Sequence, residues 1–497
     1  MASELLRKAR AYEEKNRPLI REELPVYHLT GGVGWINDPN GFAPYRGEYH
    51  LFFQYHPYDN CWGPMHWGHA RTKDFIRWEL LPAALAPDAD YDKDGCFSGG
   101  AVELPDGRHL LMYTGVRRVP QEDGSLEDRQ TQCFAIGDGM DYEKYEGNPV
   151  LTGKDLPEGG SVIHFRDPKI WREGDTFYSV IVNKTPDGSG SVLLYESPDG
   201  LHWKRNGIIS RCHNRYGRMW ECPDFFHLDG SDVLLHSAQD MRAEGLEFHG
   251  GNDTLIHVGR LDREQWKFLD ENIHTAEYGL DFYAPQTLEA EDGRRIMIGW
   301  MQSWESARER PDDLGFLGQM TVPRELRVKN GRVCQLPVRE LENYRADPVI
   351  YKNIRVEEET TLPGVRGRIL DMTLQIRPEG DPYRQFDLEI AKDAEHVTTI
   401  SLMPWKGTIR IDRTYSGFRH DVVHVREFPA AFRNGEIKLR LLLDSYSMEL
   451  FVGEGEQAAS AVLYTPAAAD GICMSADRPV LVDIEKYDLK EDACHES

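Results

Sequence analysis

The 497-residue sequence lacks long apolar runs, paired cysteines and an excess of positive charge. No stretch of about 18 apolar residues occurs, so no transmembrane helix is predicted. Residues 1–8 carry charges where a secretory signal peptide has an apolar core. The eight cysteines include no CxxC pair, which is typical of free thiols in a reducing compartment. The sequence therefore predicts a soluble, cytoplasmic protein without a disulfide framework.

Basic residues are outnumbered, with 58 Lys and Arg against 83 Asp and Glu, and the formal net charge is −25. Such a surface repels nucleic acid and anionic membranes, so neither is expected as a partner. A neutral substrate fits this charge better than a polyanion, although a local basic pocket is compatible with the same sum.

Cofactor motifs are missing as well. The 18 histidines form no HExxH or similar ligand set, so no catalytic metal is predicted. Gly31, Gly32 and Gly34 are not followed by the helix that a dinucleotide-binding loop requires, and they indicate a turn. We expect no cofactor.

The chain begins with a helical pattern and continues with strands. Residues 1 to about 22 predict a short amphipathic helix that ends near Pro18, with Leu5, Leu6, Ala9 and Tyr12 on one side. From Val26 almost to the end, short apolar segments are bounded by Gly, Asp, Asn and Pro, which is typical of strands. The fold class predicted is all-β with a short N-terminal helix.

A tight turn with glycine, followed by an apolar strand, recurs five times at intervals of about 60 residues. The turn glycines are Gly47, Gly107, Gly174, Gly230 and Gly293. Five units of about four short strands each predict a five-bladed β-propeller. A sandwich with irregular insertions is the alternative.

After the repeats, apolar and polar residues alternate more regularly, at 372–376, 386–390 and 448–451. This alternation predicts a β-sandwich. A short helix is possible at 338–344. We therefore divide the chain into an N-terminal extension (1–25), a propeller (26–335), a linker (336–352) and a sandwich (353–497).

Three carboxylates recur at similar places in three of the repeats: Asp38, Asp167 and Glu221. Because the first strand of every blade lines the axis of a propeller, these side chains are expected to converge there. Two carboxyl groups that flank a sugar are the requirement for glycoside cleavage. Singly, each has a simpler explanation, since an Asp before Pro commonly makes a turn and Glu221 could pair with Arg166 or Arg218.

Sequence neighbours suggest separate roles. Glu221 has the apolar neighbours Trp220, Cys222, Pro223, Phe225 and Phe226, whose desolvation would favour the protonated form of a general acid. Asp38 lies among Asn37, Asn40 and turn amides, which would keep a nucleophile ionised. Asp167 follows Arg166 and is expected to stay charged.

Aromatic residues near these turns fit stacking on a sugar ring, although ordinary propeller packing explains any one of them equally well. They are Trp35, Trp62, Trp67, Phe97 and Trp300.

Four motifs carry a family resemblance: WINDPNG at 35–41, FSGG at 97–100, FRDPK at 165–169 and ECPD at 221–224. In order and spacing they resemble those of glycoside hydrolase family 32, the invertases and β-fructofuranosidases, from about Tyr27 to the end of the chain. The resemblance implies a five-bladed propeller plus a β-sandwich and retaining hydrolysis of terminal β-D-fructofuranosides such as sucrose or short fructo-oligosaccharides. It also implies Asp38 as nucleophile, Glu221 as acid/base and Asp167 as transition-state stabiliser.

By the same matching, a further set of residues would line the fructose subsite: Asn37, Gln54, Trp62, Phe97, Ser98, Arg166, Cys222 and Trp300. The chain departs from many members at Ile36, where Met is common, and at Gly100, where Ser is common. Neither change removes a catalytic group, but the preference for a leaving group stays open.

Other hypotheses are compatible with the sequence. Within the enzyme class these are a sucrose-6-phosphate hydrolase and a transfructosylase, and outside it a non-catalytic carbohydrate-binding propeller. A sialidase-like propeller fits less well, because only residues 197–203 loosely resemble an Asp-box. Retention predicts that the carboxyl groups of Asp38 and Glu221 lie about 5 to 5.5 Å apart. A homo-oligomer is possible, and the sequence does not decide it.

Overall fold

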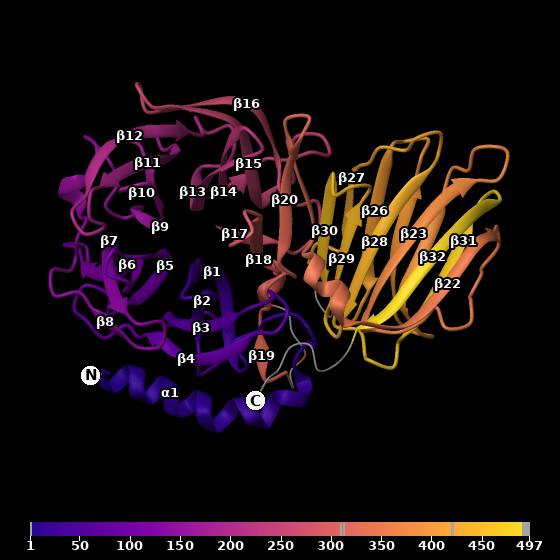
Figure 1. Cartoon of the computed structure of the whole chain (residues 1–497), viewed down its shortest axis with the longest axis horizontal. Helices are drawn as coiled ribbons and strands as arrows, with labels where there is room; N and C mark the ends of the chain where they lie inside the picture. Colours follow the sequence, from indigo (N-terminus) through magenta and orange to yellow (C-terminus); the bar gives the residue numbers. More distant parts are fainter. Residues whose placement is uncertain (1, 309–310, 312–313, 419–421, 490–497) are drawn as a thin grey trace.

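The computed structural model describes residues 2–308, 311, 314–418 and 422–489. Figure 1 shows a ring of small sheets, in indigo to salmon, beside two packed sheets in orange and yellow. The all-β class, with a propeller, a sandwich and a short N-terminal helix, is confirmed. Within the described residues, no helix combines the length and apolar character that a membrane crossing needs.

Helix α1 (Glu4–Asn16) runs along the outside of the first blade and is followed by the 3-10 helix η1 (Arg17–Glu23). The Ser3 side chain accepts a hydrogen bond from the backbone N of Leu6, which caps the helix. Leu6 and Ala9 are buried as predicted, but Leu5 is 41% exposed. The prediction for Leu5 is wrong because the buried face continues instead to Glu13, whose Oε2 accepts from the backbone N of Ala83 in strand β4.

Five sheets form the ring, and each has four antiparallel strands that follow one another along the chain, except that β19 leaves the fifth sheet and joins the first. The first holds β1 (Gly34–Tyr45), β2 (Glu48–His56), β3 (His66–Thr72) and β4 (Glu79–Leu85), with β19 (Phe316–Leu317) parallel to β1. The second holds β5 (Gly95–Glu103), β6 (His109–Pro120), β7 (Leu126–Gly137) and β8 (Tyr142–Lys144). The third holds β9 (Arg166–Glu173), β10 (Thr176–Lys184), β11 (Gly190–Ser197) and β12 (Lys204–Arg211), and the short helix η2 (Gly153–Asp155) precedes it.

The fourth sheet holds β13 (Met219–Leu228), β14 (Ser231–Met241), β15 (Gly251–Asp262) and β16 (Lys267–Thr275). The fifth holds β17 (Tyr283–Glu289), β18 (Arg295–Trp300), β20 (Arg324–Lys329) and β21 (Arg332–Pro337), with η3 (Ser306–Arg308) in the β18–β19 connection. Strands β1, β5, β9, β13 and β17 contact one another in turn around the axis, so the ring closes. The five repeat glycines have φ between 58° and 84°, a region where only glycine avoids a steric cost, which explains the repeat.

The sandwich begins after η4 (Arg339–Tyr344), which lies within one residue of the predicted helix. Its six-stranded sheet holds β22 (Arg345–Val356), β32 (Val480–Leu489), β23 (Leu370–Pro378), β28 (Ile437–Asp444), β29 (Ser447–Val452) and β30 (Gln457–Val462). Its five-stranded sheet holds β27 (Val425–Pro429), β26 (Thr408–Tyr415), β25 (Val397–Met403), β24 (Phe386–Lys392) and β31 (Gly471–Ala476). Part of the predicted linker, 345–352, therefore belongs to β22. The domain boundaries themselves stay a prediction.

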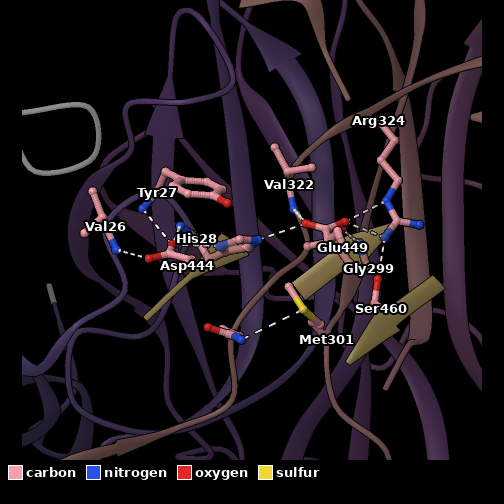
Figure 2. A network of polar contacts seen from close by, with 12 residues as sticks. Val26, Tyr27, His28, Gly299, Met301, Val322, Arg324, Asp444, Glu449 and Ser460 are labelled. Atoms are coloured by element: carbon pink, nitrogen blue, oxygen red, sulfur yellow. Dashed lines mark hydrogen bonds and ion pairs between the residues drawn. The ribbon is translucent and has the colours of Figure 1, made fainter. Parts of the chain in front are cut away.

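A buried polar network joins the propeller to the sandwich (Figure 2). His28 contacts Asp444 at 2.8 Å through Nδ1 and Glu449 at 2.9 Å through Nε2. Glu449 also accepts from the backbone N of Val322 at 2.8 Å and from Arg324 Nε at 3.0 Å. Burial opposes a charge on His28, but these hydrogen bonds to carboxylates win and raise its pKa to about 9. The network anchors the start of the propeller to the sandwich strands β28 and β29.

Candidate functional site

The innermost strands of all five blades are irregular at the same level near the axis. Their pairing is interrupted at 36–39, 97–99, 166–169, 221–224 and 283–286. The backbone there enters the left-handed region at Asp167, with φ 60°, and at Cys222, with φ 46°. Such bulges redirect side chains away from the regular pleat, and local strain of this kind is typical of functional sites.

The redirected side chains surround a cavity of about 320 Å³ at the end of the propeller axis. All three predicted carboxylates line it, together with six of the eight predicted subsite residues: Asn37, Gln54, Trp62, Phe97, Ser98 and Arg166. The three carboxylates come from three different blades, so only the closed ring brings them together.

Asp38 is held by three hydrogen bonds. Ser98 Oγ donates to its Oδ2 at 2.7 Å, Asn37 Nδ2 donates to its Oδ1 at 3.1 Å, and Cys222 Sγ contacts Oδ2 at 3.4 Å. Burial and the charge of Glu221 nevertheless raise the pKa of Asp38, and the three hydrogen bonds oppose that rise. The hydrogen bond from Asn37 favours the carboxylate form, as expected from the sequence, but burial and the charge of Glu221 have the larger effect on the pKa of Asp38.

Asp167 is buried behind this group. Its Oδ2 accepts from the backbone N of Cys222 at 3.1 Å and lies 3.6 Å from Arg166 Nε. Burial raises the pKa of Asp167 to about 7, Arg166 opposes the rise, and the charges of Glu221 and Asp38 add to it. The expectation that Asp167 stays charged is wrong, because burial together with the charges of Glu221 and Asp38 outweighs the effect of Arg166 on its pKa.

Glu221 lies among polar donors. Arg166 donates to its Oε1 through Nε at 3.2 Å and Nη2 at 3.0 Å, while Gln239 Nε2 and Tyr283 OH each donate to Oε2 at 2.8 Å. Of its sequence neighbours, Trp220 stacks on His236 with ring centroids 3.7 Å apart, whereas Cys222 contacts Asp38 and Asp167. The assignment of Glu221 as the general acid stays a prediction.

Several predicted aromatic contacts lie behind the cavity wall. Trp300 is fully buried and packs against Trp35 and Trp304, with ring centroids 5.9 Å and 5.0 Å away. Trp35 and Trp67 are buried as well, so of the five predicted stacking residues only Trp62 and Phe97 line the cavity. Trp300 does not line it, and Cys222 reaches the site through Asp38 and Asp167 rather than through the cavity surface.

Sequence reasoning missed other lining residues: Asp128, Gln130, Ile163, His164 and Trp304. They lie on β7 and in connections between strands, and not on the innermost strands that carry the three carboxylates. No local pattern marks them, except that Trp304 follows a predicted aromatic by four residues. Within the described ranges, no cluster of three or more His, Cys, Asp or Glu side chains is arranged to hold a metal ion.

Chemically, the cavity offers several carboxyl groups beside one guanidinium, in a space that a sugar ring can fill. Repulsion among buried carboxylates disfavours full ionisation, so a proton and an anionic nucleophile are available together. This pairing of a proton donor with a carboxylate defines a glycoside hydrolase built on a propeller.

Comparison with known proteins also identifies a glycoside hydrolase. The model for the glycosyl hydrolases family 32 N-terminal domain matches residues 28–337, and that for the family 32 C terminal matches residues 340–488. The chain belongs to glycosyl hydrolase family 32.

Individual relatives cover nearly the whole chain. A sucrose-6-phosphate hydrolase of Escherichia coli is 35% identical over 92% of this chain and 93% of its own. A raffinose invertase of the same species is 33% identical over 89% of this chain and 90% of its own. A mutant Bombyx mori β-fructofuranosidase, solved in complex with sucrose, is 32% identical with a TM-score of 0.83 over 98% of this chain and 99% of that one. The predicted family and the predicted enzyme class, a β-fructofuranosidase, are confirmed.

Proposed function

We propose that the protein releases the terminal β-D-fructofuranosyl unit of sucrose and short fructo-oligosaccharides with retention of configuration, and that Asp38, Glu221 and Asp167 carry the reaction. The supporting observation is that these three carboxyl groups, from three blades, line one cavity of about 320 Å³. The family match supports the chemistry, and the sucrose complex of the Bombyx mori relative supports the substrate class.

Asp38 is the nucleophile that attacks the anomeric C2 of fructose. The donors Ser98 and Asn37 hold its two carboxylate oxygens in fixed directions, as in-line attack requires. A raised pKa also makes the Asp38 carboxylate a stronger nucleophile once it is ionised.

Glu221 is the acid/base. It donates a proton to the glycosidic oxygen, and then accepts one from the water that releases fructose from Asp38. Since Arg166, Gln239 and Tyr283 hold both of its oxygens, its orientation is set before the sugar binds. Asp167 binds fructose hydroxyls and stabilises the positive charge that develops at C2.

The fructose subsite comprises Asn37, Gln54, Trp62, Phe97, Ser98 and Arg166, all of which line the cavity. Cys222 supports it from behind by contacting both Asp38 and Asp167. Trp300 supports the site by packing against Trp35 and Trp304, of which Trp304 lines the cavity.

Sucrose 6-phosphate is a second candidate substrate, because the Escherichia coli relative at 35% identity is a sucrose-6-phosphate hydrolase. We favour neutral sugars, since Arg166 is the only Lys or Arg side chain among the described lining residues and it already pairs with Glu221 at 3.0 Å. A cytoplasmic location agrees with the seven described cysteines, all of which are free thiols. The oligomeric state stays open.

A substrate panel tests this function. Purified protein is incubated with sucrose, sucrose 6-phosphate, kestose and inulin, and free fructose is measured together with any transfer product. Proton NMR at early times identifies the first anomer released, which should be β-fructofuranose. Inversion, or binding of sucrose without release of fructose, would refute the retaining mechanism or the enzymatic function respectively.

A further inference from the structure

One wall of the cavity takes no part in the proposed mechanism. This blade-2 wall consists of Asp128 and Gln130 on β7 together with Ile163 and His164 from the segment before β9. The backbone N of Gln130 donates to the carbonyl O of Val162 at 3.0 Å, so the strand and the segment lie side by side.

The wall lies on the side of the proposed acid/base. Arg166 Nη1 donates to His164 Nδ1 at 3.0 Å, while Arg166 Nη2 donates to Glu221 Oε1 at 3.0 Å. The bond that breaks has fructose on the side of Asp38 and the leaving group on the side of Glu221. Arg166 therefore links the carboxyl group of Glu221 to the blade-2 wall, which lies next to the acid/base.

Gln130 has an unused acceptor. Its side chain is 5% exposed, and Oε1 has no hydrogen-bond partner in the described part of the chain. A buried polar atom of this kind ordinarily has a partner, and a ligand hydroxyl would supply one. Alternate residues of a strand share a face, so Asp128 presents its carboxylate on the same side as Gln130.

His164 supplies a donor. An arginine N–H can only donate, so His164 Nδ1 must accept and its ring proton is on Nε2. Burial, with the charges of Arg166 and Lys184, lowers the pKa of His164 to about 4, so the ring is neutral at pH 7. The wall thus offers hydroxyl groups two acceptors, Gln130 Oε1 and the charged Asp128 carboxylate, and one donor, His164 Nε2.

We propose that the blade-2 wall is the leaving-group subsite and that it selects an unphosphorylated hexose, an inference that rests on the proposed function. Hydroxyls of glucose would satisfy Gln130, Asp128 and His164. A phosphate dianion on that glucose would meet the Asp128 carboxylate, which Arg118 Nε balances only from an exposed position 3.3 Å away.

The test compares two leaving groups. In Gln130→Ala, kcat/KM for sucrose should fall about tenfold, whereas kcat/KM for p-nitrophenyl β-D-fructofuranoside, whose leaving group has no sugar hydroxyls, should change less than about twofold. The matched control is Arg129→Ala, because Arg129 lies on the opposite face of β7 and pairs with Glu127 at 2.6 Å. It should leave both substrates unchanged.

A second variant tests whether the charge of Asp128 selects against a phosphorylated leaving group. Asp128→Asn should raise the ratio of kcat/KM for sucrose 6-phosphate to that for sucrose by several-fold, about the effect of removing one nearby charge. The inference is overturned if Gln130→Ala affects both substrates equally or neither. It is also overturned if the wild type prefers sucrose 6-phosphate to sucrose, or if Asp128→Asn leaves the ratio of the two kcat/KM values unchanged. A wild type that cleaves neither sucrose nor the nitrophenyl fructoside would instead refute the proposed function.

Discussion

Replacing His28 should remove a pH-dependent part of the stability of the propeller–sandwich interface. His28 is fully buried between Asp444 and Glu449, and its pKa rises from 6.5 to about 9 on folding. At about 1.4 kcal/mol per pKa unit, this shift corresponds to about 3 kcal/mol of folding free energy.

The sign follows from the direction of the shift. Because the folded protein holds this proton more tightly than the unfolded chain, the contribution is complete below pH about 6.5 and disappears as the pH rises to about 9. The pKa of Asp444 is lowered because the hydrogen bond and charge of His28 outweigh burial, and the pKa of Glu449 is lowered because Arg324 and His28 do so. Their titration lies outside this window.

The assay is urea unfolding of the wild type and His28→Gln at pH 6 and pH 9, followed by tryptophan fluorescence. The difference in free energy of unfolding between the two proteins should shrink by about 3 kcal/mol from the lower to the higher pH. His213→Asn is the control, because His213 is exposed and its φ of 48° is one that Asn tolerates. If the free energy of unfolding differs between the wild type and His28→Gln by the same amount at both pH values, the pH-dependent contribution of His28 is refuted.

Asp38→Asn should lower kcat for sucrose by at least about a thousandfold. Its thermal midpoint should stay the same or rise, because burial and the charge of Glu221 already disfavour the carboxylate in the folded protein. In Glu221→Gln, the acid limb of the pH profile of kcat/KM for p-nitrophenyl β-D-fructofuranoside should move to lower pH. The reason is that burial still raises the pKa of Asp38 but the charge of Glu221 no longer does. An acid limb at the wild-type pH would contradict the assignment of that limb to Asp38. Arg324→Met should cost about 3 to 5 kcal/mol in unfolding free energy, because it leaves the buried Glu449 without its guanidinium. The exposed Arg327→Met is the control, and equal thermal midpoints for the two variants would contradict a role for the buried pair.

The propeller was predictable because its signals are local. A turn that needs a positive φ requires glycine, and Gly47 and its four equivalents mark one turn in each blade. The positions of Asp38, Asp167 and Glu221 relative to these glycines then placed all three on innermost strands. Their meeting in one cavity follows from the closure of the ring, which the repeat itself implies.

The surroundings of those residues were not predictable. Trp300 and Trp304 differ in sequence by only four positions, yet Trp304 lines the cavity while Trp300 is buried behind it. Trp220, which precedes Glu221 in sequence, stacks on His236 instead of contributing to the cavity. Its actual partners, Gln239 and Tyr283, come from β14 and β17.

By itself, the sequence determined the order of the strands, the five turns and the identity of the three carboxyl groups, since each depends on residues close together in the chain. Only the tertiary structure decided which carboxyl groups are buried together, and that His28 meets Asp444 across 416 positions. The physical reason is that burial and charge depend on every neighbour in space. Asp38 and Asp167 have raised pKa values because the closed ring buries them near Glu221.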